Sequence, residues 1–173
     1  MCKSEVPGSG ELAHLLSARE ERAYAQKFLL GIRGVSCVLQ ISLNVPGVPK
    51  NMPEGDSALA LAVSMFLASC DAGSLGRVSL LNSAGRAELI ALGRDAAEVK
   101  AAAVEIEERE EWGRAIDADV ITELGPVSRT SIGKYPRRCL LCDEPAKTCA
   151  RARGHGIDEL REEVLRLLAL ARR

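Results

Sequence analysis

Between residues 35 and 132, short segments rich in β-branched residues alternate with longer segments of helical periodicity. Segments of the first kind predict strands, and segments of the second kind predict helices. The predicted strands are Val35–Val45, Arg77–Asn82, Ala87–Leu92, Ala115–Thr122 and Val127–Ile132, and the predicted helices are Ser57–Cys70 and Asp95–Glu108. This order is β-α-β-β-α-β with one added strand. It predicts an α+β fold with an antiparallel, ferredoxin-like sheet that carries two helices on one face.

Each flank of this unit is predicted to contribute one more helix. Ser17 and Glu20 have the spacing of a capping box, which predicts a helix from Ser17 to about Leu30. The start of the chain, residues 1–14, is rich in Gly, Ser and Pro and is predicted to be loose. The final segment, residues 157–171, carries an apolar stripe at helical spacing and predicts a C-terminal helix that docks on the core.

The segment 134–156 differs from the rest of the chain. It is basic, rich in cysteine and without a regular apolar period, so it is predicted to be a loop. A length of 173 residues suits one domain with a sizeable core. We therefore expect residues 1–173 to form a single catalytic domain.

The composition argues against nucleic-acid and membrane partners. The net charge is −1 and the chain has one Trp, two Tyr and two Phe, which is a poor basis for a basic or base-stacking surface. The first residues lack an apolar leader, and no run approaches the roughly 20 apolar residues of a membrane span. The sequence therefore predicts a cytoplasmic protein. Its six cysteines are not expected to form disulfides in that reducing compartment.

Two aspartates in the segment GRAIDADV, residues 113–120, are the clearest candidate for chemistry. On a strand, Asp117 and Asp119 project from the same face, while the residues around them pack inward. Two such carboxylates can converge on one Mg²⁺, which takes substrate phosphates as further ligands. Arg114 precedes them and offers a cation for those phosphates. Considered alone, the pattern also fits two solvated aspartates on the polar face of an edge strand.

Several motifs in a fixed order carry a family resemblance. GRAIDADV is followed by PRRCLLC and CARARGH within residues 136–155, and it is preceded by REERAYAQ at Arg19–Gln26 and LNVPGVPKN at Leu43–Asn51. This combination resembles the apo-citrate lyase phosphoribosyl-dephospho-CoA transferases, also called citrate lyase holo-acyl-carrier-protein synthases. The resemblance covers nearly the whole chain. One departure is the pair Ala115 and Ile116, where the family usually has larger apolar residues such as Leu and Trp, and we interpret it as repacking.

The resemblance implies a nucleotidyl transfer to a protein. The donor would be triphosphoribosyl-dephospho-CoA, the acceptor a serine of the acyl-carrier (γ) subunit of citrate lyase, and the leaving group pyrophosphate. It implies that Asp117 and Asp119 hold Mg²⁺ and that Arg114 acts with them as the third catalytic residue. The substrate-binding residues implied are Asn44, Gly47, Lys50, Gly113, Arg137 and Arg138.

The late cysteines suggest a second metal site. Cys139 and Cys142 are spaced C-x2-C, Cys149 follows after six further residues, and His155 follows after five more. This layout is that of a Cys3His structural zinc site. Two alternatives remain open, which are ordinary packed thiols and a role for His155 as the general base.

Two other functions compete with the citrate lyase interpretation. One is a non-catalytic adaptor that uses its zinc-binding segment to hold a partner, and such a protein has no need of two aspartates on one strand face. The other is the related transferase that modifies the carrier protein of malonate decarboxylase. The cysteine-rich segment favours the citrate lyase enzyme, because we associate it with that family.

Overall fold

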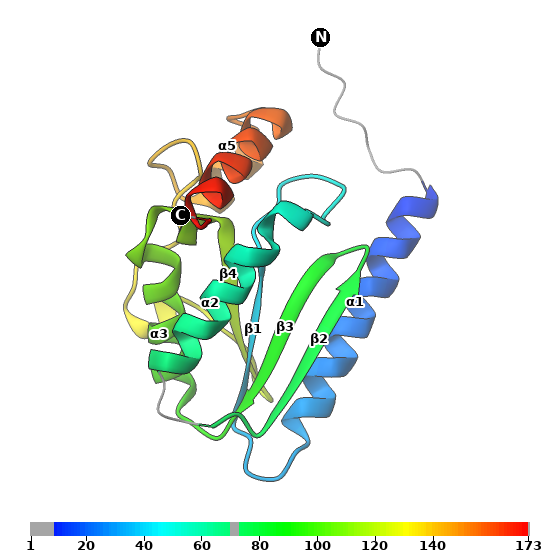
Figure 1. Ribbon diagram of the computed structural model, residues 1–173, viewed down its shortest axis with the longest axis vertical. Coiled ribbons are helices and arrows are strands. Elements are labelled where there is room, and N and C mark those ends of the chain that lie inside the picture. The colour runs from blue at the N-terminus through cyan, green and yellow to red at the C-terminus, as the bar shows by residue number, and fades with distance from the viewer. Residues whose placement is uncertain (1–8, 70–72, 173) are drawn as a thin grey trace.

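The computed structural model describes residues 9–69 and 73–172, and it shows an α+β fold around one five-stranded sheet (Figure 1). The strand order is β2-β3-β1-β4-β5, and each neighbouring pair is antiparallel. The strands are β1 (Cys37–Leu43), β2 (Gly76–Asn82), β3 (Gly85–Leu92), β4 (Ile116–Thr122) and β5 (Gly125–Val127).

Helices cover the two faces of this sheet unequally. One face packs against the helices α2 (Asp56–Ser69), α3 (Ala96–Arg109) and α5 (Ile157–Leu170) in the larger core cluster. The other face packs against α1 (Ser9–Leu30) in a smaller cluster with residues of β1 and β3. Figure 1 shows α1 lying along the β2–β3 side of the sheet, away from β4. Part of the α1 face is therefore left open over β4.

Strand β1 explains how the two faces are specified. Leu39 and Ile41 belong to the larger core, and Val38 belongs to the cluster beneath α1. Gln40 and Ser42 are also buried, although they are polar. They alternate with Leu39 and Ile41 and so point to the α1 face. A central strand is expected to be buried on both faces. Buried polar residues on one face therefore indicate that this face has a role besides packing the core.

The first helix begins earlier than the sequence predicts. It starts at Ser9 and not at Ser17, so residues 9–14 are helical, and residues 1–8 lie outside the described part of the chain. The β2–β3 hairpin holds this first stretch, because the Ser83 hydroxyl donates to the His14 carbonyl over 2.7 Å. Such long-range support outweighs the local Gly and Ser signal on which the prediction rests.

The predicted strand Val127–Ile132 is wrong beyond its first residue. Strand β5 ends at Val127, and residues 130–132 form a short 3₁₀ turn. Ser128 causes this change, because its hydroxyl accepts from the Ser131 amide over 3.0 Å and its carbonyl accepts from the Ser131 hydroxyl over 2.8 Å. These local hydrogen bonds compete with strand pairing.

The remaining helices and strands agree with the predicted order within a few residues, with two differences. A short helix, α4 (Ala146–Ala152), lies within the segment 134–156 that was predicted to be a loop. The predicted end of the second helix, Cys70, lies outside the described residues. None of the helices in residues 9–69 and 73–172 is long and apolar enough to cross a membrane.

Candidate functional site

Strand β4 places the two aspartates as the alternation of its sequence predicts. Asp117 and Asp119 are half exposed, with 43% and 50% of their side chains accessible. The residues that alternate with them, Ile116, Ala118 and Val120, are buried in the larger core. The carboxylates therefore share the open face of the sheet, beside α1.

The register of the sheet sets these carboxylates opposite polar residues of β1. Asp117 pairs with Ser42, and Asp119 pairs with Gln40. The Gln26 side chain of α1 reaches across and donates from Nε2 to Oε1 of Gln40 over 2.9 Å. Side chains from α1, β1 and β4 thus line one continuous polar strip on this face.

Electrostatics make this strip suited to a cation. Burial raises the pKa of the Asp119 carboxyl, and the nearby charge of Asp117 raises it further. The buried Lys100 offsets only part of this effect, because its Nζ lies 4.0 Å from Oδ1 of Asp119 and donates to the Ala118 carbonyl over 2.8 Å. Two neighbouring carboxylates that repel each other are stabilised when a cation binds between them.

A buried charge network supports β4 at the level of the aspartates. Glu107 of α3 accepts from the Ala118 amide over 2.7 Å and pairs with both Arg129 and Arg137. Arg137 also donates to the Ile116 carbonyl over 2.8 Å and lies 3.4 Å from the Asp117 carboxylate. Arg137 is therefore brought to the aspartates as the sequence suggests, but most of its charge is balanced by Glu107.

The other two predicted arginines lie elsewhere. Arg114 donates to the carbonyls of Cys139 and Leu140 over 2.6 and 2.9 Å, so its guanidinium holds the cysteine-rich segment. Arg138 is exposed and pairs with Asp143 at 2.8 Å. In the part of the chain that the structure describes, neither contacts the aspartates, and their roles in the reaction stay predictions.

Three further predicted residues make packing contacts. Asn44 donates weakly from Nδ2 to the Arg114 carbonyl over 3.4 Å. Gly47 has φ +62° and lies against Ile157, and a Cβ there would come within 2.6 Å of that side chain. A Cβ on Gly113 would lie 2.3 Å from the Ile106 carbonyl. Both glycines are thus needed for close backbone approach within the protein, and their contacts with a donor stay predictions.

The sequence reasoning assigned no role to two cations of α1. Arg22 lies close enough to Asp117 for that carboxylate to raise its pKa, although burial lowers the pKa overall. Arg19 is the neighbour of Arg22 one helical turn earlier. The motif REER contained this signal, because residues three apart share one face of a helix. The sequence alone does not show that tertiary packing turns this helix face toward β4.

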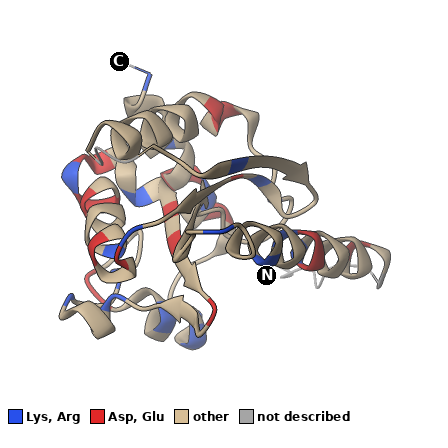
Figure 2. Cartoon of the chain, turned by 90° about the horizontal axis from the view of Figure 1, so that it is seen from below, with Lys and Arg blue, Asp and Glu red and all other residues tan. Residues whose placement is uncertain are grey.

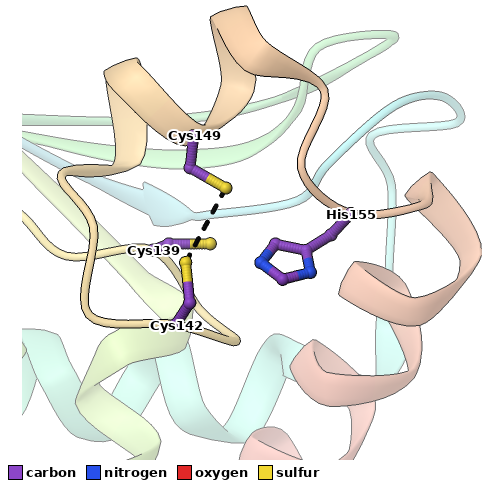
Figure 3. A group of neighbouring side chains, drawn as sticks. All are labelled: Cys139, Cys142, Cys149 and His155. Atoms are coloured by element: carbon purple, nitrogen blue, oxygen red, sulfur yellow. Dashed lines mark hydrogen bonds between the residues drawn. The ribbon is translucent and has the colours of Figure 1, made fainter.

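The three late cysteines and His155 converge on one point (Figure 3). Their ligand atoms all lie within 4.8 Å of one another. The Sγ atoms of Cys142 and Cys149 are 3.9 Å apart, close to the roughly 3.8 Å that two sulfurs have on a tetrahedral ion with bonds of about 2.3 Å. The cysteines are free thiols. This geometry can hold a metal ion, as the spacing predicts.

The backbone around this Cys3His cluster is built for convergence. The Cys139 amide donates to the Glu144 carbonyl over 2.8 Å, which closes the turn that carries Cys142. Helix α4 supplies Cys149, and the chain then reverses through Arg153, which has φ 50°. The reversal returns the His155 ring toward the three sulfurs (Figure 3).

Charges of both signs are spread over the surface, as Figure 2 shows by the mixture of basic and acidic positions along the helices. Two cavities lie near the features described so far. One, of about 620 Å³, is lined by residues of α1, the 48–51 connection and the β2–β3 hairpin. The other, of about 540 Å³, is lined mainly by the acidic end of α3 and the arginines around it.

Comparison with known proteins decides the family. The model of the apo-citrate lyase phosphoribosyl-dephospho-CoA transferases matches residues 10–170. The chain belongs to this family. It is therefore an enzyme, and the group it transfers goes to apo-citrate lyase, as the family description states. The resemblance seen in the sequence motifs is confirmed.

Individual relatives agree with this assignment. A protein of Streptococcus pyogenes serotype M18 (strain MGAS8232), named as a probable apo-citrate lyase phosphoribosyl-dephospho-CoA transferase, is 31% identical over 97% of this chain and 91% of its own length. Its counterpart in serotype M1 is 30% identical over the same shares. The transferase of Escherichia coli O7:K1 (strain IAI39 / ExPEC) is 33% identical over 53% of this chain and 51% of its own length.

Proposed function

We propose that this transferase moves a phosphoribosyl-dephospho-CoA group from a triphosphate precursor to a serine of the acyl-carrier (γ) subunit of citrate lyase. The observation that carries the proposal is the pair Asp117 and Asp119 on an open face of the sheet, with cationic side chains of α1 and Arg137 beside them. Transfer of phosphorus groups depends mainly on positioning and on neutralising charge, and this face offers both.

The proposed step is one displacement at phosphorus. The serine oxygen of the carrier forms a bond to the phosphorus nearest the ribose, and the bond from that phosphorus to the bridging oxygen breaks. Pyrophosphate leaves with the electron pair of the broken bond, and the serine proton passes to solvent or to a base. The carrier is then joined to the group through a phosphodiester.

We assign Mg²⁺ to Asp117 and Asp119. The residues fit the ion, because both carboxylates are half exposed on one face of the sheet. Burial and the charge of Asp117 raise the pKa of Asp119, so a bound cation would relieve the repulsion between the two carboxylates. When bound, Mg²⁺ would neutralise phosphate oxygens. The carboxylates hold their place through β4, whose pairing with β1 fixes both of them independently of any ion.

Arg137 and Arg114 would act as positioning residues. Arg137 ties Asp117 to the buried Glu107, so it fixes the orientation of that carboxylate. Arg114 ties the start of β4 to the carbonyls of Cys139 and Leu140, and it keeps the segment that carries Arg137 against the sheet. Neither role requires the arginine to touch the donor.

The metal of the Cys3His cluster is proposed to be zinc. Three thiolates and one imidazole within 4.8 Å of one another match the donor atoms and the size of a four-coordinate structural zinc site. All four positions are filled by protein, which suits a structural role and leaves no open position for substrate.

The wider setting follows from the same proposal. The β1-α2-β2-β3-α3-β4 core would be a ferredoxin-like unit, and the antiparallel order β2-β3-β1-β4 supports it. Residues 1–173 would act as one catalytic domain in the cytoplasm. Its partners would be the carrier subunit and triphosphoribosyl-dephospho-CoA, without nucleic acid or membrane.

Mass spectrometry of the carrier tests this function directly. Apo carrier protein of citrate lyase is incubated with the transferase, triphosphoribosyl-dephospho-CoA and Mg²⁺, and its intact mass is measured. We expect a gain of one phosphoribosyl-dephospho-CoA group on a serine. The carrier protein of malonate decarboxylase serves as the parallel substrate. Preferential modification of that carrier, or no modification of either, would contradict the proposal.

A further inference from the structure

Helix α1 runs beside the β2–β3 hairpin, and the 45–52 connection packs on this hairpin at the same end of the sheet (Figure 1). Arg22 donates from Nη2 to the carbonyls of Ala84 and Gly85 over 2.7 and 2.9 Å. A Cβ on Gly85 would lie only 2.7 Å from the Lys50 carbonyl, so the connection packs directly on this hairpin. Arg22 and Lys50 are thereby brought to the end of β4 where Asp117 lies.

Arg22 is held in place without being satisfied. Its two hydrogen bonds to the hairpin fix the guanidinium, but its buried Nε has no hydrogen-bond partner among the described residues. Arg19, one turn earlier, makes no hydrogen bond or ion pair with any residue that the structure describes. A guanidinium that is already fixed and keeps an unused donor is available to bind an anionic group.

Lys50 adds a third positive charge to the same place. Its Nζ donates to the Val45 carbonyl over 2.6 Å, which orients the side chain along the connection. Burial lowers the pKa of Lys50, and the charges of Arg19 and Arg161 lower it further, while Asp117 acts in the opposite direction. The cations of this group therefore repel one another, and the charge of Asp117 offsets only part of this repulsion at Lys50.

Most of the other arginines near β4 have a carboxylate partner. Arg137 and Arg129 both pair with the buried Glu107. Arg138 pairs with Asp143, and Arg114 is bound by backbone carbonyls. An incoming anion gains less from a cation that already has a partner. Arg19, Arg22 and Lys50 form no ion pair with a described residue, so the cations without a carboxylate partner gather mainly on the α1 side of the aspartates. Arg114 and the unpaired Nη1 of Arg137 add donors on the side of the cysteine-rich segment.

A cavity lies close to these cations, although none of the three lines it. The cavity of about 620 Å³ is lined by Pro49 and Asn51, which flank Lys50, and by Asn82 and Ser83 of the hairpin that holds Arg22. A phosphorylated ligand bound to the cations would thus have room for its organic part. The cavity is large enough for such a group, since ligand pockets commonly span about 300–1,000 Å³.

We infer that Arg19, Arg22 and Lys50 form a polyphosphate-binding site, which receives the triphosphate of the donor and holds the pyrophosphate that leaves. The ligand class follows from the charge, because a cluster of three cations suits several linked phosphates better than one. Identifying this polyphosphate with the donor rests on the proposed transfer reaction. The site itself rests on the geometry at this end of the sheet.

Calorimetry with inorganic pyrophosphate and triphosphate tests the site without any transfer reaction. Each ligand is titrated into the full-length protein in the presence of Mg²⁺, with inorganic phosphate as a third ligand. We expect the two polyphosphates to bind and phosphate to bind much more weakly. Arg22→Gln and Lys50→Gln should each weaken triphosphate binding by about 10–100-fold, as loss of a charge-assisted contact does.

Two variants guard against an effect of folding. Arg19→Gln removes an exposed side chain that forms no hydrogen bond or ion pair with the described residues, so it should fold normally and still weaken polyphosphate binding. Arg94→Gln is the matched control, because within residues 9–69 and 73–172 the Arg94 side chain pairs only with Glu98, at 3.3 Å, and it follows the end of β3 that is opposite the hairpin. It should leave binding unchanged within about twofold. Circular dichroism and thermal melting check each variant.

The outcomes separate this site from the proposed function. Unchanged affinity in Arg19→Gln and Arg22→Gln, equal weakening in Arg94→Gln, or no binding of polyphosphate by the unaltered protein would each overturn the inference. If the carrier is modified while these variants bind triphosphate normally, the site is wrong and the function stands. If polyphosphate binding depends on the three cations but neither carrier is modified, the site stands and the proposed function fails.

Discussion

The open face of β4 and the cysteine-rich segment 134–156 both gather metal-type ligands, but they do so in different ways. Asp117 and Asp119 are placed by strand pairing with β1 and by the buried residues between them. Cys139, Cys142 and Cys149 are placed by a turn, a short helix and a reversal, with little apolar core of their own. The first arrangement is fixed by the fold. The second arrangement is expected to depend on the metal it binds.

This difference predicts different roles for the two regions. A site that the sheet holds open can exchange ligands without loss of structure, as a reacting centre must. A closed Cys3His site gives its binding energy to local folding. The two regions are connected by Arg114 and Arg137, which lead from the cysteine-rich segment to β4. Breaking either region separately should therefore have different consequences.

The largest effect is expected at the aspartates. Asp117→Asn and Asp119→Asn each remove a charge that the proposed Mg²⁺ requires, and carrier modification should fall by about a thousandfold or more. Both side chains are half exposed, so the fold should be kept. Turnover is measured by mass spectrometry at saturating Mg²⁺, with circular dichroism as the control. Near-normal turnover in either variant would show that its carboxylate does not hold the metal.

A smaller but wider effect is expected at the cysteines. Cys142→Ser should release about one zinc per chain and loosen residues 134–156, while the sheet stays intact. Activity should fall in part, because this segment carries Arg137. Metal analysis and hydrogen exchange measure the two effects, and Cys37→Ser is the matched control, since Cys37 is a buried thiol of β1 outside the cluster. Negligible zinc in the unaltered protein would favour packed thiols.

Substitutions of the adjacent residues Arg137 and Arg138 should lower the free energy of unfolding by different amounts. Arg137→Gln removes one partner of the buried Glu107, which keeps Arg129, so the loss should lie near the lower end of about 3–5 kcal/mol. Arg138→Gln removes an exposed pair with Asp143 and should cost about 0–1 kcal/mol. Urea unfolding at one pH measures both. Equal losses would mean that the Glu107 network does not support β4.

The sequence predicted these two regions with different success, and the reason is physical. Strand alternation fixes which residues share a face, so the common face of Asp117 and Asp119 could be predicted from local sequence. The C-x2-C spacing likewise predicted a convergence that the structure confirms. The direction of Arg114 could not be predicted, because it depends on carbonyls of Cys139 and Leu140 that lie far along the chain.

The same limit explains the missed cations of α1. The motif that contains Arg19 and Arg22 places both on one helix face, but only tertiary packing turns that face to β4. The end of the sheet shows the reverse case, where local chemistry decides. The Ser128 hydrogen bonds end the strand after Val127, although the strand was predicted to continue to Ile132.

The smallest effect is expected in the pH dependence of stability, and it concerns Asp119. Burial and the charge of Asp117 raise its pKa in the folded protein above the ordinary 3.8, so the folded state binds more protons than the unfolded state between these two values. Asp119 therefore costs no stability below pH 3.8, and its cost grows as the pH rises through the folded pKa.

Asp119→Asn removes this cost. Thermal melting without metal should show the variant slightly more stable than the unaltered protein near neutral pH, with the difference vanishing in acid. Added Mg²⁺ should shrink or reverse the difference, because only the unaltered protein keeps both carboxylates for the ion. A variant that is less stable at every pH, with or without Mg²⁺, would show that Asp119 stabilises β4 and is not held there for a ligand.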